Sequence, residues 1–199
     1  MRLGVCVSGQ GTNLRNLVDR GFDVVAVATN RPTCPAAGFA REQGIPVGEL
    51  PQRSFGSAEQ RDAAMRDFFL AHRVDLIVDA GYDRIHTPPF IDAFAGRIVN
   101  VHPSLLPMFA GGMDAIEQAL ESGLKFTGAT VHIVTGEVDA GPILVQDSVP
   151  ILEGDTVETL RDRVHEVERR ILPEGIRMME ARLDEGSPPT HGEASKFVG

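Results

Sequence analysis

The sequence predicts an α/β fold: a doubly wound, Rossmann-like sheet in a single domain, parallel in its N-terminal half and mixed in its C-terminal half. Short β-branched runs alternate with longer amphipathic segments, which is typical of parallel strands joined by crossover helices. In the second half, two strand-like runs follow each other in a hairpin-like arrangement. With 199 residues, 42% of them hydrophobic, the chain is long enough to bury one core.

The predicted strands are short apolar runs, and the predicted helices have apolar residues at helical spacing, several of them ending at a glycine. The strands are Leu3–Val7, Val24–Thr29, Leu76–Ala80, Ile98–His102, Gly128–Val134 and Ile143–Val149. The helices are Asn13–Arg20, Ala36–Gln43, Ala58–His72, a short one at Pro89–Phe94, Ile116–Ser122 and Thr156–Leu183, with Pro173 as a candidate interruption. Residues 184–199, rich in proline and glycine, predict a loosely ordered tail.

Charge and composition restrict the classes of partner. The net charge of −9 and the pI near 5.1 disfavour a nucleic-acid-binding protein, which needs clustered Lys and Arg. The sequence has neither a signal-peptide pattern nor a membrane-spanning apolar run, so we expect a cytoplasmic protein that does not bind membranes. Cys6 and Cys34 form neither a CxxC motif nor a disulfide framework, and Cys6 between two valines is interpreted as a core residue.

A glycine-containing loop, SGQGTN from Ser8 to Asn13, lies between the first predicted strand and helix. Gly9 and Gly11 allow a tight turn, and Thr12 and Asn13 are candidate helix caps beside backbone amides that could bind a phosphate. The loop lacks both the third glycine of a dinucleotide fingerprint and the GK[ST] of a P-loop. It therefore suits a single phosphate, although a well-capped tight turn remains the simpler alternative.

The segment VNVHPSLLP, Val99 to Pro107, places two polar side chains near the end of a predicted strand. Asn100 and His102 are two residues apart and therefore point to the same face, and Pro103 ends the strand. A carboxamide can stabilise an oxyanion, and an imidazole can deliver a proton. Asp139, in the loop TGEVDAGP, is a candidate third group that would orient the His102 ring and favour its imidazolium form. The alternatives are a structural histidine and an Asx turn.

The remaining histidines and cysteines indicate no metal site, because no group of His, Cys, Asp or Glu has the spacing of metal ligands. His132 in TVHIV could support the site from a neighbouring strand, but a core or a surface position explains it equally well.

Together these segments resemble the folate-dependent glycinamide ribonucleotide formyltransferases, a branch of the formyltransferase superfamily. The resemblance extends from Leu3 to about Leu183. It rests on SGQGTN, TNRPTCPAAGFAREQGIP, DLIVDAGYDRI, GRIVNVHPSLLP, TGATVHIVTGEVDAGPILVQDSVPI and DTVETLRDRVHEVERRILP.

The resemblance implies direct transfer of a formyl group from 10-formyltetrahydrofolate, a co-substrate, to the amine of glycinamide ribonucleotide, a step of purine biosynthesis. It implies small-molecule substrates and leaves a homodimer open. The positions that match the family's functional residues are Asn100, His102 and Asp139 (catalytic), Gly11, Thr12, Asn13 and Glu168 (substrate), and Asp83, Arg84, Ile85, His86 and Asn100 (folate).

The resemblance also implies how the chain is organised: a formyltransferase domain over residues 1–183, with a phosphate- and substrate-binding lobe (1–100) and a folate and catalytic lobe (101–183). Two alternative functions remain. One is a formyltetrahydrofolate hydrolase, or a formyltransferase for another amine, and the other is a non-catalytic protein that binds a phosphate ligand.

The sequence departs from the family pattern at several positions. Asp83 and His86 stand where the family usually has Met and Leu, and Asp79 replaces an aliphatic residue. The loop around Gly111 and Gly112 is one residue longer than usual. An arginine common after Ser57 is missing, and Arg53 and Arg61 are candidate substitutes.

Overall fold

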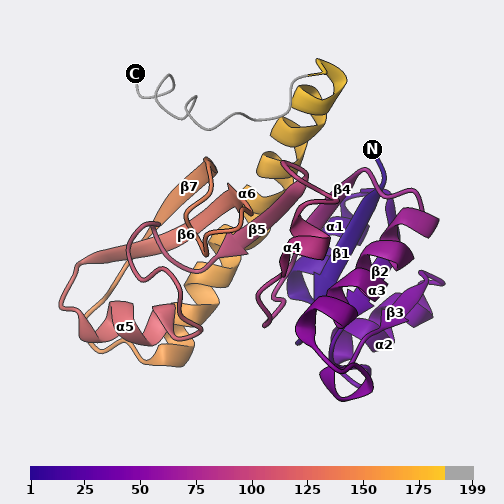
Figure 1. Ribbon diagram of the computed structural model, residues 1–199. Coiled ribbons are helices and arrows are strands. Elements are labelled where there is room, and N and C mark those ends of the chain that lie inside the picture. The colour runs from indigo at the N-terminus through magenta and orange to yellow at the C-terminus, as the bar shows by residue number, and fades with distance from the viewer. Residues whose placement is uncertain (187–199) are drawn as a thin grey trace. The chain divides into compact units, whose positions relative to one another are not determined.

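The computed structural model describes residues 1–186 (Figure 1). Of the predicted tail, residues 187–199 lie outside the described residues. The chain divides into two compact units, of which the first is Met1–Val99 and the second begins at Asn100. Each unit is described by itself below.

The strands and helices confirm the predicted α/β fold with a mixed sheet. Within the described residues the strand order is β3-β2-β1-β4-β5-β6-β7. The strands are β1 (Leu3–Val7), β2 (Val24–Thr29), β3 (Val47–Glu49), β4 (Leu76–Asp79), β5 (Ile98–His102), β6 (Phe126–Ile133) and β7 (Ile143–Pro150). The helices are α1 (Thr12–Asp19), α2 (Pro35–Glu42), the 3-10 helix η1 (Gln52–Ser54), α3 (Ala58–Ala71), α4 (Pro88–Ile91), α5 (Ala115–Glu121) and α6 (Val157–Asp184).

The first unit is a parallel sheet with helices on both faces. β1 pairs in parallel with β2 and with β4, and β2 pairs with β3. The chain moves from β1 outward to β3 and then crosses back to β4, and right-handed crossovers in opposite directions place their helices on opposite faces. The face of Gly4 is covered by α3, because a Cβ at Gly4 would lie 2.7 Å from the ring of Phe69.

This reversal of direction puts a switch point between β1 and β4. Ligands of doubly wound sheets bind beyond the carboxyl ends of the strands at such points. The loop after β1 begins with Ser8, whose amide donates to the carbonyl of Gly81 in the loop after β4 at 3.1 Å. The topology of the first unit therefore brings these two loops together.

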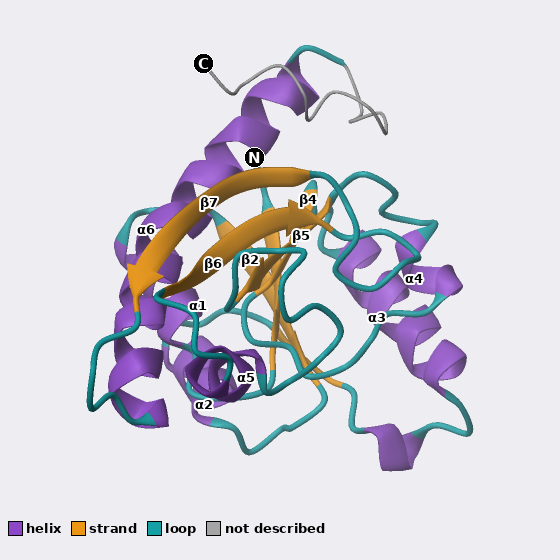
Figure 2. Cartoon of the chain, turned by 90° about the vertical axis from the view of Figure 1, so that its left-hand side faces the viewer, coloured by secondary structure: helices purple, strands orange, loops and turns teal. Residues whose placement is uncertain are grey.

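In the second unit, β6 and β7 form a long antiparallel pair that packs against α6 (Figure 2). The register runs from Phe126 opposite Pro150 to His132 opposite Ile143, with a shift between Val131 and His132. The helix α6 continues through Pro173, which is buried, so the predicted interruption is wrong. The side chain of Thr156 accepts a hydrogen bond from the Thr159 amide at the start of this helix.

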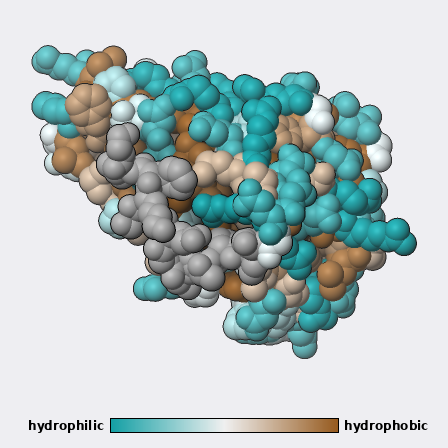
Figure 3. All heavy atoms as spheres, turned by 90° about the horizontal axis from the view of Figure 1, so that it is seen from above, coloured by the Kyte–Doolittle hydropathy of each residue, from teal (hydrophilic) through white to brown (hydrophobic). Residues whose placement is uncertain are grey.

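Most predicted elements agree with the structure to within one or two residues. The short helix predicted at Pro89–Phe94 is Pro88–Ile91, and β3 and η1 were not predicted. No helix among residues 1–186 is long and apolar enough to cross a membrane. Polar side chains dominate the face seen in Figure 3, with apolar ones scattered among them.

Candidate active site

Asn100 and His102 lie on the last residues of β5. Their spacing of two puts both side chains on one face of the strand, as predicted. His102 is buried and Asn100 is half-buried, while Pro103 follows immediately. The strand therefore presents both polar side chains at its carboxyl end.

The two ring nitrogens of His102 both face hydrogen-bond acceptors. Nε2 lies 3.1 Å from the carbonyl oxygen of Phe109, and Nδ1 lies 3.5 Å from Oδ2 of Asp139. A carbonyl and a carboxylate can only accept hydrogen bonds. Each ring nitrogen of His102 therefore has an acceptor to which it can donate a hydrogen bond.

Asp139 is held in position by its own backbone and by the longer loop. Its φ of 52° is in the left-handed region, which is rare for residues other than glycine and is concentrated at functional sites. The amide of Gly111 donates to Oδ2 at 2.9 Å, and the side chain is only 12% exposed. The predicted loop aspartate is thus fixed with its carboxylate toward His102.

His132, whose role the sequence did not determine, lies against both Asn100 and Asp139. Its Nε2 lies 3.2 Å from Nδ2 of Asn100 and 3.6 Å from Oδ1 of Asp139. Its Nδ1 lies 3.2 Å from the carbonyl oxygen of Ile133, which suits a tautomer protonated at Nδ1. In that tautomer Nε2 accepts from Asn100, and the second amide hydrogen of Asn100 can point elsewhere.

The second unit therefore brings Asn100, His102 and Asp139 into one group, joined through His132. A carboxamide donor, a histidine and an oriented carboxylate together can stabilise an oxyanion and move a proton. Glu168 lies on α6 of the same unit and is buried.

In the first unit, Gly11 fits its position for two reasons. Its φ is 76°, and a Cβ at Gly11 would lie 2.7 Å from Cβ of Ala36 at the start of α2. Gly11 is itself the N-cap of α1, so the prediction that Thr12 and Asn13 cap the helix is wrong. The N-cap of α1 makes no side-chain hydrogen bond, and a helix N-terminus of this kind favours an anion.

The polar residue Asp83, which replaces an expected methionine, joins the loop after β4 to the glycine-containing loop. Its amide donates to Oγ of Ser8 at 3.0 Å, and its Oδ1 accepts from Nδ2 of Asn30 at 2.7 Å. Its Oδ2 forms an ion pair with Arg31. The carboxylate therefore fixes the geometry of both loops.

The other members of this segment differ in exposure. Ile85 is 69% exposed, Arg84 is exposed, and His86 is buried and paired with Asp79. Arg61 is buried in an ion pair with Asp62, 2.7 Å away, and donates to the carbonyl of Ile85 at 3.4 Å. The guanidinium of Arg61 thus contacts the loop that contains Ile85.

Comparison with known proteins shows the family. Residues 1–176 match the model of the formyl transferase family. A phosphoribosylglycinamide formyltransferase of Mycobacterium tuberculosis is 44% identical over 176 residues, which are 86% of this chain and 81% of that protein. The human trifunctional purine biosynthetic protein adenosine-3 is 36% identical over 184 residues, but the chain spans only 18% of its length.

Solved structures agree with this assignment. The glycinamide ribonucleotide transformylase 1 of Symbiobacterium toebii has a TM-score of 0.88 at 44% identity, over 92% of this chain and 89% of that one. The phosphoribosylglycinamide formyltransferase of Bacillus halodurans has a TM-score of 0.87 at 34% identity. The chain therefore belongs to the formyl transferase family.

Proposed function

We propose that this protein is a phosphoribosylglycinamide formyltransferase, which transfers a formyl group from 10-formyltetrahydrofolate to the amine of glycinamide ribonucleotide. The observation that carries the proposal is the group of Asn100, His132, Asp139 and His102 in the second unit. It is supported by the 44% identity to a phosphoribosylglycinamide formyltransferase along most of both chains. The product enters purine biosynthesis.

The substrate amine is the nucleophile, so the protein needs no activated Ser or Cys. The amine attacks the formyl carbon and gives a tetrahedral intermediate with a negative oxygen. Asn100 donates to that oxygen, the positive charge of a protonated His102 stabilises it, and Asp139 holds the imidazolium. Collapse of the intermediate releases tetrahydrofolate, as a proton of the substrate amine passes through His102 or water to the departing folate nitrogen.

The remaining residues bind the two substrates. The amides at Gly11, Thr12 and Asn13 bind the phosphate of glycinamide ribonucleotide, since the first turn of α1 lacks side-chain caps. Glu168 binds its ribose. The segment Asp83–His86 binds folate, and the 69% exposed Ile85 offers an apolar surface to it.

An assay with alternative acceptors tests this function. Purified protein is mixed with 10-formyltetrahydrofolate, with and without glycinamide ribonucleotide, and the absorbance of the folate product is followed. We expect turnover only when glycinamide ribonucleotide is present. Equal turnover with water alone would instead indicate a hydrolase, and no turnover with either acceptor would indicate a binding protein.

A further inference from the structure

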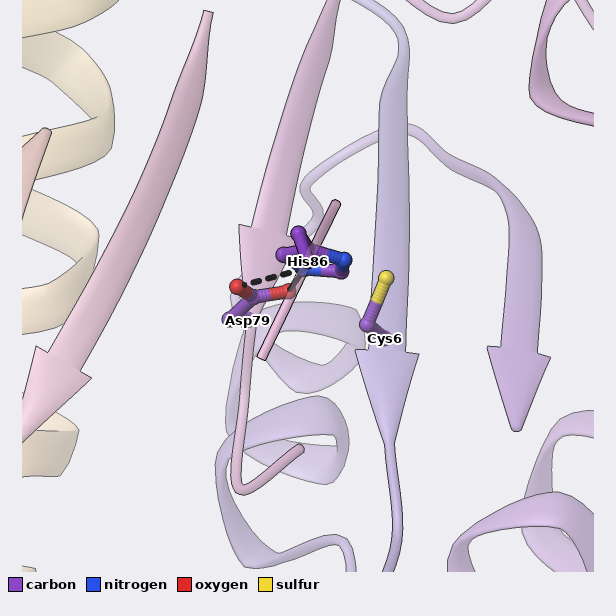
Figure 4. A group of neighbouring side chains, drawn as sticks. All are labelled: Cys6, Asp79 and His86. Atoms are coloured by element: carbon purple, nitrogen blue, oxygen red, sulfur yellow. Dashed lines mark hydrogen bonds and ion pairs between the residues drawn. The ribbon is translucent and has the colours of Figure 1, made fainter. Parts of the chain in front are cut away.

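A group of three polar side chains is buried in the first unit. Cys6 on β1 and Asp79 on β4 are directly opposite each other in the parallel ladder, so their side chains lie on the same face (Figure 4). His86 joins them from the loop after β4. Its Nε2 lies 2.9 and 3.0 Å from the two carboxylate oxygens of Asp79.

All three residues are buried. Their relative exposures are 0% for Cys6 and 6% each for Asp79 and His86. One ligand atom of each residue, the thiol sulfur, a carboxylate oxygen and an imidazole nitrogen, lies within 4.8 Å of the other two. Such polar groups are costly to bury unless each has a partner.

Two polar atoms at this place have no hydrogen-bond partner among residues 1–186. They are Nδ1 of His86 and the hydroxyl of Tyr82, both buried. The rings of Tyr82 and His86 are stacked, with centroids 5.1 Å apart. When Nε2 of a neutral His86 donates to Asp79, Nδ1 keeps a lone pair that no donor satisfies. The described side chains therefore do not satisfy every polar atom of this group, and a metal at Nε2 would replace the hydrogen bond between His86 and Asp79.

We propose that Cys6, Asp79 and His86 bind a zinc ion. Thiolate, carboxylate and imidazole are all ligands that zinc accepts, and three protein ligands leave one position open. Zinc bonds of about 2.0 to 2.3 Å put tetrahedral ligand atoms about 3.3 to 3.6 Å apart. Nε2 of His86 and the Asp79 carboxylate, which lie 2.9 to 3.0 Å apart, must therefore open slightly, and the other ligand atoms must close by at most about 1.5 Å from the 4.8 Å limit.

The charges at this place balance with a divalent cation. Burial and the carboxylate of Asp79 raise the pKa of the Cys6 thiol well above its ordinary value, so the thiol is protonated without metal. Zinc binding displaces that proton to solvent, and the thiolate and Asp79 together offset the two positive charges. The nearby ion pair of Arg61 and Asp62 adds no net charge.

A metal measurement on the intact protein tests this proposal without any substrate, so it is independent of the formyltransferase assay. Because the site is buried, the protein is produced in medium supplemented with zinc, or with cobalt, and purified without chelators. We expect one zinc per chain by elemental analysis. The cobalt protein should have a thiolate-to-cobalt charge-transfer band and the visible bands of four-coordinate cobalt.

Variants of the two cysteines provide the matched control. Cys6→Ala should lose the charge-transfer band and at least tenfold of the metal content, whereas Cys34→Ala, which changes the other buried cysteine, should retain both. Circular dichroism checks that each variant is folded. A wild-type protein with no bound zinc and no charge-transfer band overturns the proposal, and so does a folded Cys6→Ala that keeps the band. Either result would leave Cys6, Asp79 and His86 as a hydrogen-bonded group.

Discussion

Among single residues, His132 is the most important addition to the site that the sequence predicted. It lies against both Asn100 and Asp139, and its Nε2 accepts from the amide of Asn100, so it orients the amide donor. The sequence identified Asn100 and His102 because a spacing of two on a strand fixes a common face. The sequence could not predict the direction of the His132 side chain, because that direction depends on the register shift between Val131 and His132.

Substitution of His132 tests its positioning role. We expect His132→Ala to lower kcat by about 2- to 12-fold with little change in KM, since a hydrogen bond that orients a catalytic group contributes about 0.5 to 1.5 kcal/mol. Steady-state kinetics with His72→Ala as the control measures this. An unchanged kcat in folded His132→Ala would show that Asn100 needs no such support.

Among the elements, the start of α1 depends on Gly11. Gly11→Ala places a Cβ in the left-handed region and against Ala36, and we expect the free energy of unfolding to fall by about 1 to 3 kcal/mol. Gly9→Ala is the control, because a Cβ at Gly9 would meet nothing within 4 Å. Urea denaturation of both variants compares them. Equal stabilities would mean that the loop relaxes without cost.

The start of α6 provides a pH prediction. Asp155 is paired with Arg163 and accepts from the amide of Leu152 at 2.7 Å, and these contacts lower the pKa of its carboxyl below the ordinary 3.8. A lowered folded pKa gives stability that is present above pH 3.8 and is lost as the pH falls through the folded value.

We therefore expect Asp155→Asn to be less stable than wild type at neutral pH, with the difference shrinking as the pH falls below about 4. Urea denaturation at pH 7 and at pH 3 measures the two differences. Asp162→Asn on the same helix is the control, because it removes a charge but leaves the contacts of Asp155 with Arg163 and Leu152 in place. A difference that does not depend on pH would contradict the role of the Asp155 carboxylate.

Strong local patterns made most elements predictable. β1, β2 and β5 have the predicted bounds, since each is a short apolar run between turn residues. β3, Val47–Glu49, has only three residues and contains a glycine, so it has no recognisable period. The interruption predicted at Pro173 does not occur, because the packing of a long amphipathic helix outweighs the loss of one backbone hydrogen bond.

For the molecule as a whole, the order of strands and helices along the chain predicted the fold. It did not predict which polar side chains, distant in the sequence, lie together in the structure. The alternation of strands and helices was sufficient for the α/β class. Cys6, Asp79 and His86 are separated by up to 80 residues, and only the ladder register of β1 and β4 brings them together. The spacing of metal ligands therefore could not reveal this group, and the sequence predicted no metal.

The central claim is that this protein moves a formyl group onto the amine of glycinamide ribonucleotide, with Asn100 stabilising the oxyanion. The most direct measurement is a single turnover with donor that is labelled with ¹³C in the formyl group, analysed by mass spectrometry. We expect the label in formylglycinamide ribonucleotide, and a rate about 10² to 10³ lower in Asn100→Ala. Label recovered as formate, or an unchanged rate in folded Asn100→Ala, would contradict the account.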